Sequence, residues 1–198
     1  MKLFCTKRSP YARKVRVVAI EKGIKLDLIE QDLLNKSDAL LAANPLGKIP
    51  ALVIGKGQFL VDSPVICQYL DGLKPKPRLI PKDPKNRFDV LKIEAIADGI
   101  MDAAVLAFME KSRHGENFHK EFFANQEKAI VRSFEYLLKQ KKILSDFNLG
   151  SIAAACAIGY VNLRLGHLNP KENLPQLAKW FDAFSLRPSM QQTIPVVS

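Results

Sequence analysis

The chain has 198 residues, of which 47% are hydrophobic, 25% charged and 8% aromatic. These fractions are those of an ordinary globular protein, and they exclude a disordered, collagen-like or fibrous chain. Thirty Lys and Arg residues against twenty Asp and Glu give a formal net charge of +10, which indicates either an anionic ligand or an evenly solvated basic surface. The length is sufficient to bury a core without metal ions or disulfides.

The cysteine and histidine content gives no sign of cross-links or of a structural metal. Cys5, Cys67 and Cys156 are odd in number and widely spaced, so we expect no disulfide framework and a reducing compartment. The three histidines do not have the spacing of metal ligands. No apolar run near Met1 is long enough for a signal peptide, and the most apolar run, residues 152–161, is far shorter than the roughly 20 residues of a membrane span. We therefore expect a cytoplasmic protein that binds no metal and no membrane.

Strand-like runs and helical runs alternate over about the first 73 residues. In chain order we predict a strand at 2–5, a helix at 11–22, a strand at 26–29, a helix at 37–43, a hairpin of 51–54 with 58–61 around Gly55-Lys56-Gly57, and a helix at 64–73. Gly23 should end the first helix. The helical spacing places Arg13, Lys14 and Arg16 outside the apolar face of that helix. A βαβ unit followed by a hairpin and a helix predicts a mixed four-stranded sheet covered by helices.

A proline-rich connector follows this first part. Four prolines fall within residues 74–84, and proline neither continues a helix nor donates to a strand ladder. Only helical periodicity follows, in a long helix from about Pro84 and in helices around 123–137, 152–163 and 175–184. Ser151 is the expected N-cap of the third of these. We predict an α/β domain at 1–74, a linker at 75–84 and an all-helical domain at 85–198.

Ser9-Pro10 marks the start of the first helix. A serine before a proline is typical of an N-cap followed by the first helical residue. The same hydroxyl would lie at the positive end of the helix dipole, where it can accept a backbone hydrogen bond and still donate its proton to an anion. Ser9 is therefore either a plain helix start or an anion-binding residue.

Two further motifs have similar chemistry. Pro50 directly precedes a strand, where a cis bond would form a tight turn and turn the Ile49 backbone toward an extended peptide ligand; a plain turn is the alternative. Asp62-Ser63-Pro64 repeats the Ser9-Pro10 pattern, with Ser63 as the candidate cap. Ser63 would bind a carboxylate and Asp62 an ammonium group, which together suit an α-amino-acid zwitterion.

Residues 9–16, 44–52 and 62–70 together resemble cytosolic glutathione S-transferases of the bacterial, serine-type branch. The proline-rich linker, the helical second half and residues 187–190 fit the same family. The resemblance implies a thioredoxin-like N-terminal domain that binds glutathione as co-substrate, an all-α C-terminal domain, and a homodimer.

The resemblance also implies roles for individual residues. Ser9 matches the catalytic serine of the family. Ile49 matches the residue before the cis-proline, whose backbone pairs with the cysteinyl unit of glutathione. Asp62 and Ser63 match the acid–serine pair that binds the γ-glutamyl end, with aspartate in place of the commoner glutamate. The complete implied set for glutathione is Ser9, Lys36, Lys48, Ile49, Pro50, Asp62 and Ser63, with the two lysines at the glycyl carboxylate.

A second, apolar substrate is implied beside glutathione, and Tyr11, Met101 and Val105 are the implied residues of its pocket. One departure from the family lies in the buried helix, which usually begins Ser-x-x-Asp. Here the sequence from Ser151 to Ala154 lacks the acid, and the loss of that reciprocal bond should cost about 1 kcal/mol.

The residues leave three functions open. The leading hypothesis is a transferase that joins glutathione to small electrophiles, as in detoxification, with weak peroxidase activity as an addition. The second is a catalytically silent scaffold or regulatory binding protein with the same fold. A glutaredoxin-like thiol transferase is disfavoured because the serine at position 9 cannot form a mixed disulfide. Nucleic-acid binding is disfavoured because the basic residues are not interleaved with stacking aromatics.

Overall fold

The computed structural model describes residues 1–195 of the chain. Its contacts group into two compact units, one of residues 1–80 with the C-terminal segment from Arg187, the other of residues 81–186. The division falls inside the predicted linker. The segment from Arg187 was expected in the helical domain, but it packs with the N-terminal unit through contacts between α9 (Pro188–Gln191) and the first helix.

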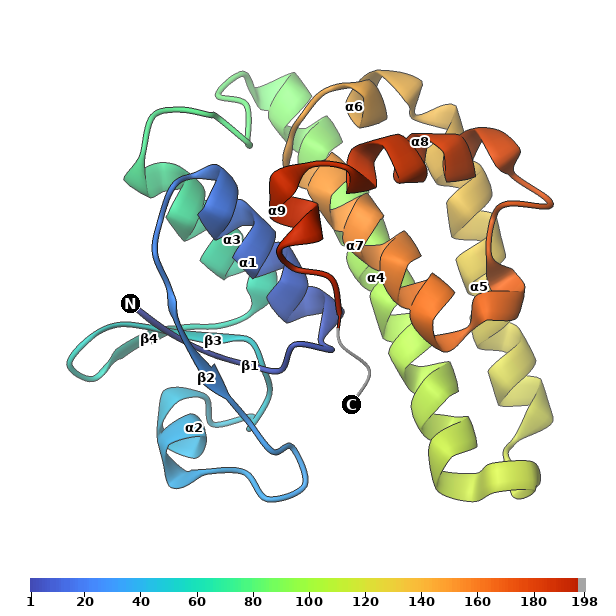
Figure 1. The fold of residues 1–198 in the computed structure, drawn as a ribbon, viewed down its shortest axis with the longest axis horizontal. Helices are drawn as coiled ribbons and strands as arrows, with labels where there is room; N and C mark the ends of the chain where they lie inside the picture. The colour runs from blue at the N-terminus through green and yellow to red at the C-terminus, as the bar shows by residue number, and fades with distance from the viewer. Residues whose placement is uncertain (196–198) are drawn as a thin grey trace. The chain divides into compact units, whose positions relative to one another are not determined.

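The N-terminal unit contains the predicted order of elements: β1 (Lys2–Cys5), α1 (Pro10–Glu21), β2 (Asp27–Glu30), α2 (Asp38–Ala43), β3 (Ala51–Gly55), β4 (Gln58–Leu60) and α3 (Ser63–Leu73). The strands form one sheet in the order β2-β1-β3-β4. The β1–β2 pair is parallel, and the β1–β3 and β3–β4 pairs are antiparallel. The predicted mixed four-stranded sheet is confirmed, and it is the arrangement of a thioredoxin-like domain. Helices α1 and α3 pack against each other on one face, and α2 lies on the opposite face (Figure 1).

Local signals explain where α1 begins and ends. Its N-cap is Ser9, Pro10 occupies the first turn, and Gly23 beyond its end has a φ of 57°. Ile24 N–H closes the helix by donating to the Ala19 carbonyl at 2.8 Å, as glycine-terminated helices do. The sequence placed Arg13 and Lys14 outside the apolar face of this helix, and their expected exposure was wrong: Arg13 is only 5% exposed and Lys14 is fully buried.

A buried ion pair fixes the connector to this unit. Lys22 Nζ donates to Asp71 Oδ1 at 2.8 Å and to the carbonyls of Lys74 and Pro77, both at 2.6 Å. The Asp71 carboxylate also accepts the N–H groups of Leu79 and Ile80 at 3.0 and 3.1 Å. The prolines remove local hydrogen bonds, and this pair replaces them with long-range ones.

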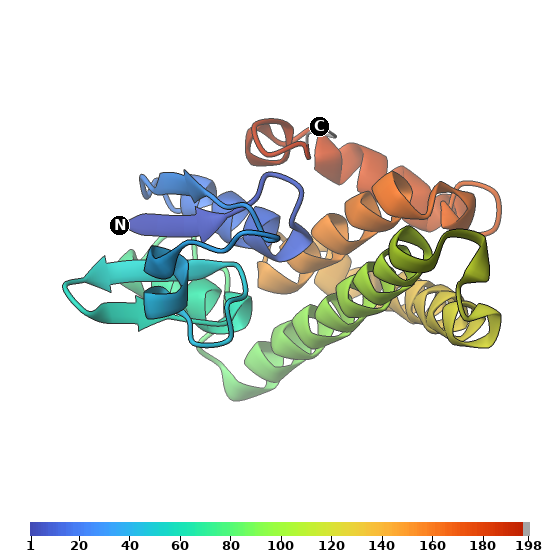
Figure 2. The same cartoon turned by 90° about the horizontal axis from the view of Figure 1, so that it is seen from below.

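The second unit is all helical. Its elements are α4 (Pro84–His114), the 3₁₀ turn η1 (Gly115–Asn117), α5 (Lys120–Lys139), α6 (Lys141–Ser145), α7 (Leu149–Arg164), the 3₁₀ turn η2 (Gly166–Leu168) and α8 (Pro175–Ser185). Helix α4 packs along both α7 and α5, and Figures 1 and 2 show α4 and α7 side by side. Helix α7 is buried on all sides along most of its length. No helix among residues 1–195 is both long and apolar enough to cross a membrane.

The start of α7 corrects the expected cap. Asn148, not Ser151, is the N-cap, and Ser151 occupies the third helical position. Ser151 N–H donates to Asn148 Oδ1 at 2.9 Å, and Asn148 N–H donates to Ser151 Oγ at 3.1 Å. This is a complete capping box, in which the Ser151 hydroxyl accepts the N-cap N–H in place of the usual carboxylate or amide. The expected loss of about 1 kcal/mol of folding stability therefore does not arise.

Candidate functional site

The strand register brings the three sequence motifs to one edge of the sheet. Phe4, near the end of β1, pairs with Ala51 at the start of β3. Leu52 in turn pairs with Leu60 at the end of β4. The segments that leave the sheet at this edge are therefore the ones that carry Ser9, Ile49 with Pro50, and Asp62 with Ser63.

Ser9 is positioned by the turn between β1 and α1. Its N–H donates to the Thr6 carbonyl at 3.2 Å, and its Oγ accepts the Ala12 N–H at 3.2 Å. The predicted N-cap is thus present, and the side chain is half-buried. Among residues 1–195, no group accepts the Ser9 hydroxyl proton. The hydroxyl can donate to an anion at the helix N-terminus without giving up its capping bond.

The Ile49–Pro50 bond is cis, as the sequence predicts. Within the described chain, neither the N–H nor the C=O of Ile49 forms a hydrogen bond. The Ile49 side chain packs against the cluster of Phe4, Leu40, Ala43 and Ala51, which fixes the backbone at the sheet edge. This backbone can pair with an extended peptide.

Asn44 organises the loop that leads to Ile49, although the sequence analysis gave it no role. Asn44 is buried, donates from Nδ2 to the Lys48 carbonyl at 2.8 Å, and accepts the Leu46 N–H at 3.0 Å. Gly47 has a φ of +59°, and a Cβ there would lie 3.1 Å from Lys36 Cδ and Nζ. Lys36, which precedes α2, therefore lies beside the loop that carries Lys48 after α2, and both lysines are exposed. The Asn-Pro pair after a helix was the available signal for Asn44.

Asp62 and Ser63 divide their roles differently from the prediction. The N-cap of α3 is Asp62, whose carboxylate accepts the Ser63 N–H, and Ser63 is the first helical residue. Ser63 is fully buried, and its Oγ has no hydrogen-bond partner among residues 1–195. A buried hydroxyl without a partner costs about 1–3 kcal/mol, so this atom suits a ligand oxygen that supplies the missing bond.

Cys5 lies four residues before Ser9 but has inert surroundings. The thiol is fully buried, and burial together with the nearby negative charge of Glu30 raises its pKa to about 11. A thiol with so high a pKa carries almost no thiolate near neutral pH and is a poor nucleophile. Cys5 is therefore an inert residue of the core.

The residues expected at the second-substrate pocket belong to both units. Tyr11 is half-buried on α1, Met101 is fully buried on α4, and Val105 is half-buried one turn further along α4. Their shared role stays a prediction.

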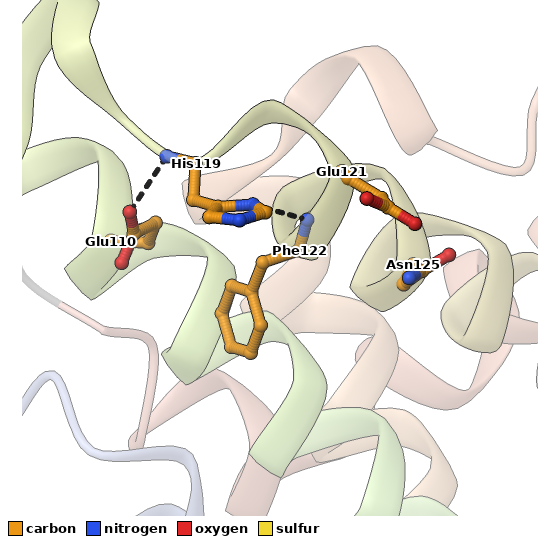
Figure 3. A pocket seen from close by; sticks show the side chains of 5 residues that line it. All are labelled: Glu110, His119, Glu121, Phe122 and Asn125. Atoms are coloured by element: carbon orange, nitrogen blue, oxygen red, sulfur yellow. Dashed lines mark hydrogen bonds between the residues drawn. The ribbon is translucent and has the colours of Figure 1, made fainter.

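A separate pocket lies where α4 and α5 meet (Figure 3), and the sequence gave no sign of it. It is lined by Glu110, His119, Glu121, Phe122 and Asn125. His119 N–H donates to Glu110 Oε1 at 2.8 Å, and His119 Nδ1 accepts the Phe122 N–H at 3.1 Å, which makes His119 the N-cap of α5. These bonds tie the ends of two helices together, and no group of His, Cys, Asp and Glu in the described chain is arranged to hold a metal ion.

The fold defines a class: a thioredoxin-like domain followed by an all-helical domain. Comparison with known proteins agrees with this class. Residues 3–78 match the glutathione S-transferase N-terminal domain family. The "Uncharacterized GST-like protein YibF" of Escherichia coli is 35% identical over 199 residues, which cover 98% of both chains.

Solved structures give the same result over the whole length. A glutathione transferase family member from Pseudomonas fluorescens Pf-5, crystallised with bound glutathione, is 39% identical, with 99% of each chain covered and a TM-score of 0.92. A structure of that family member with bound S-(propanoic acid)-glutathione covers 100% of both chains at 39% identity and a TM-score of 0.90. The chain belongs to the glutathione S-transferase family.

Proposed function

We propose that this protein is a glutathione transferase that binds glutathione at the sheet edge and activates its thiol for attack on small electrophiles. The observation that carries the proposal is the set of unused polar groups there: the Ser9 hydroxyl proton, the Ile49 main chain and the buried Ser63 hydroxyl. Glutathione is an extended peptide with a thiol and an α-amino-acid end, so it offers one partner to each of them. The glutathione and S-substituted glutathione held by the two Pseudomonas structures support this choice of ligand.

Each part of the tripeptide has a proposed partner. The Ile49 main chain, next to cis-Pro50, pairs with the cysteinyl unit as a strand edge does. Ser63 donates to the γ-glutamyl carboxylate, and Asp62 accepts from the γ-glutamyl ammonium. Lys48 and Lys36 bind the glycyl carboxylate.

Ser9 acts on the thiol without becoming a nucleophile. A free thiol has a pKa of about 8.5, so little thiolate exists at neutral pH. A hydrogen bond from the Ser9 hydroxyl, together with the positive end of α1, favours the thiolate. The thiolate then attacks an electrophilic carbon: the C–S bond forms, the leaving group departs with its bonding pair, and the thiol proton passes to solvent.

The second substrate is proposed to be a small apolar electrophile. A homodimer in the cytoplasm is proposed on the family resemblance. Size-exclusion chromatography with light scattering measures the dimer directly, and a monomer at micromolar concentration would contradict it.

The test replaces Ser9 by alanine. Because a hydrogen bond to a charged group contributes about 1.5–3 kcal/mol, kcat/KM with 1-chloro-2,4-dinitrobenzene should fall roughly 10- to 150-fold. Glutathione affinity, measured by calorimetry, should change little.

Ser37 provides the matched control. It is also an N-cap serine of the same unit, and its Oγ accepts the Leu40 N–H at 3.2 Å. Ser37→Ala removes a cap but should leave conjugation unchanged. Equal activity of Ser9→Ala and the wild type would refute the role of Ser9. If glutathione does not raise the melting temperature of the wild type, the scaffold hypothesis replaces the transferase.

A further inference from the structure

Arg13 is a buried cation one helical turn after Ser9. Its N–H donates to the Ser9 carbonyl at 2.9 Å, which fixes the spacing of the two residues on α1. Residues four apart lie on the same side of a helix, and long side chains lean toward the helix N-terminus. Arg13 is only 5% exposed, so water does little to screen its charge.

The partners of Arg13 are neutral. Nη2 donates to the Met190 carbonyl at 3.2 Å, and Nε makes a long contact of 3.5 Å to Thr193 Oγ1. Within residues 1–195, Arg13 forms no ion pair. Burying a charge is costly unless another charge compensates it, so an unpaired guanidinium in this place needs an explanation.

The C-terminal segment, residues 187–193, holds Arg13 in place. It runs antiparallel to α1: its first residue, Arg187, donates to Glu21 at the end of α1, and its last, Thr193, contacts Arg13 near the start. Ser189 Oγ also donates to Glu21, at 2.5 Å. The segment thus fastens α1 at both ends.

The carboxylates near α1 are already engaged. Glu21 binds Arg187, and Asp71 of α3 binds Lys22. Glu30, beside β1, accepts the Lys7 N–H at 3.0 Å.

Apart from Glu21, the other charged side chains of α1 are cations. Lys14 and Arg16 lie on the same helix, and Arg16 Nη2 contacts the Gln192 carbonyl at 3.4 Å. Both also have further partners. No carboxylate of the described chain pairs with Arg13, so its positive charge is available to the first turn of α1.

We propose that Arg13 is a positioning residue of the thiol site: the C-terminal segment keeps its positive charge fixed near Ser9, where it stabilises the glutathione thiolate. This inference rests on the proposed transferase function. A unit charge on the order of 10 Å away, at an effective dielectric constant of about 20, changes a thiol pKa by about one unit.

The experiment measures the pKa of enzyme-bound glutathione from the ultraviolet absorbance of its thiolate as a function of pH. Arg13→Gln keeps a donor for the Met190 carbonyl but removes the charge, so the bound thiol pKa should rise by about one unit. Arg13→Lys keeps the charge and should hold the pKa near the wild-type value. Thr193→Val removes one neutral partner and leaves the charge and the Met190 bond in place; it should lower the free energy of unfolding and raise the thiol pKa by less than Arg13→Gln does.

The outcomes separate this inference from the proposed function. If Arg13→Gln leaves the thiol pKa unchanged, or if Gln and Lys raise it equally, the charge has no role and the inference is overturned. Should Arg13→Gln not fold, Arg13→Met gives the same comparison with Arg13→Lys; if neither neutral variant folds while Lys does, Arg13 is a purely structural charge and the inference also fails. If wild-type protein does not lower the pKa of glutathione at all, the proposed function fails instead.

Discussion

Replacing Asp71 by alanine should strongly destabilise the N-terminal unit. The Asp71 side chain is 6% exposed and Lys22 is fully buried, with 2.8 Å between Oδ1 and Nζ. Alanine leaves the Lys22 ammonium buried without a counter-charge. It also leaves the N–H groups of Leu79 and Ile80 without their acceptor.

The magnitude follows from those contacts. Breaking a buried ion pair by removing one partner typically costs 3–5 kcal/mol. Lys22 retains the carbonyls of Lys74 and Pro77 at 2.6 Å, which offset part of the loss, so we expect about 3 kcal/mol. For a chain of this size that corresponds to a fall in melting temperature of roughly 6–12 °C.

The assay is urea and thermal unfolding followed by circular dichroism. The matched control is Asp89→Ala, which removes the acid of an exposed pair, Lys92–Asp89, whose members are 50% and 39% exposed. Exposed pairs contribute at most about 1 kcal/mol. If Asp71→Ala and Asp89→Ala destabilise equally, the buried pair does not hold the connector and the reasoning is refuted.

Two further predictions concern Cys5 and the loop that contains Gly47. Since burial raises the pKa of Cys5 to about 11, iodoacetamide at pH 8 should label Cys5 in unfolded but not in native protein, as mass spectrometry would show; native labelling at the unfolded rate would contradict this. Because the folded pKa is the higher one, the contribution of Cys5 to stability should be lost as the pH rises from about 9 to about 11, and Cys5→Ala should flatten that part of the profile. Gly47→Ala should weaken glutathione binding several-fold in calorimetry, because its Cβ would lie 3.1 Å from the Lys36 side chain. Gly57 has a similar positive φ of +68°, but a Cβ there would meet no atom within 4 Å. Gly57→Ala should therefore lower stability without lowering glutathione affinity. Equal losses of affinity in Gly47→Ala and Gly57→Ala would exclude the Lys36 contact as the cause.

The sequence predicted the elements well because their signals are local. Ser9-Pro10 marks the start of α1 and Gly23 marks its end, through capping interactions that require no tertiary context. The hairpin around Gly55-Lys56-Gly57 and the proline before β3 are likewise short-range signals. Given the topology, the antiparallel register then brings the three motifs to one sheet edge.

What the sequence did not predict depends on long-range partners. Arg13 is buried because carbonyl and hydroxyl groups nearly 180 residues later accept its hydrogen bonds. Helical periodicity assigns such a residue to the polar face, because it is a local pattern and does not include contacts with the C-terminal segment. The cap of α7 was misplaced for a related reason: Asn148 and Ser151 bond to each other, and only the structure shows that Asn148 lies outside the helix.

The misassigned cap of α3 matters most for the site. Had Ser63 been the N-cap, its Oγ would accept a backbone N–H and the helix start would be satisfied without a ligand. Asp62 takes that role instead, and the buried Ser63 hydroxyl keeps an unmet hydrogen bond. The free protein bears the cost of about 1–3 kcal/mol. If glutathione binds as proposed, its γ-glutamyl carboxylate supplies the missing bond, and this small loss of folding stability becomes affinity for the ligand.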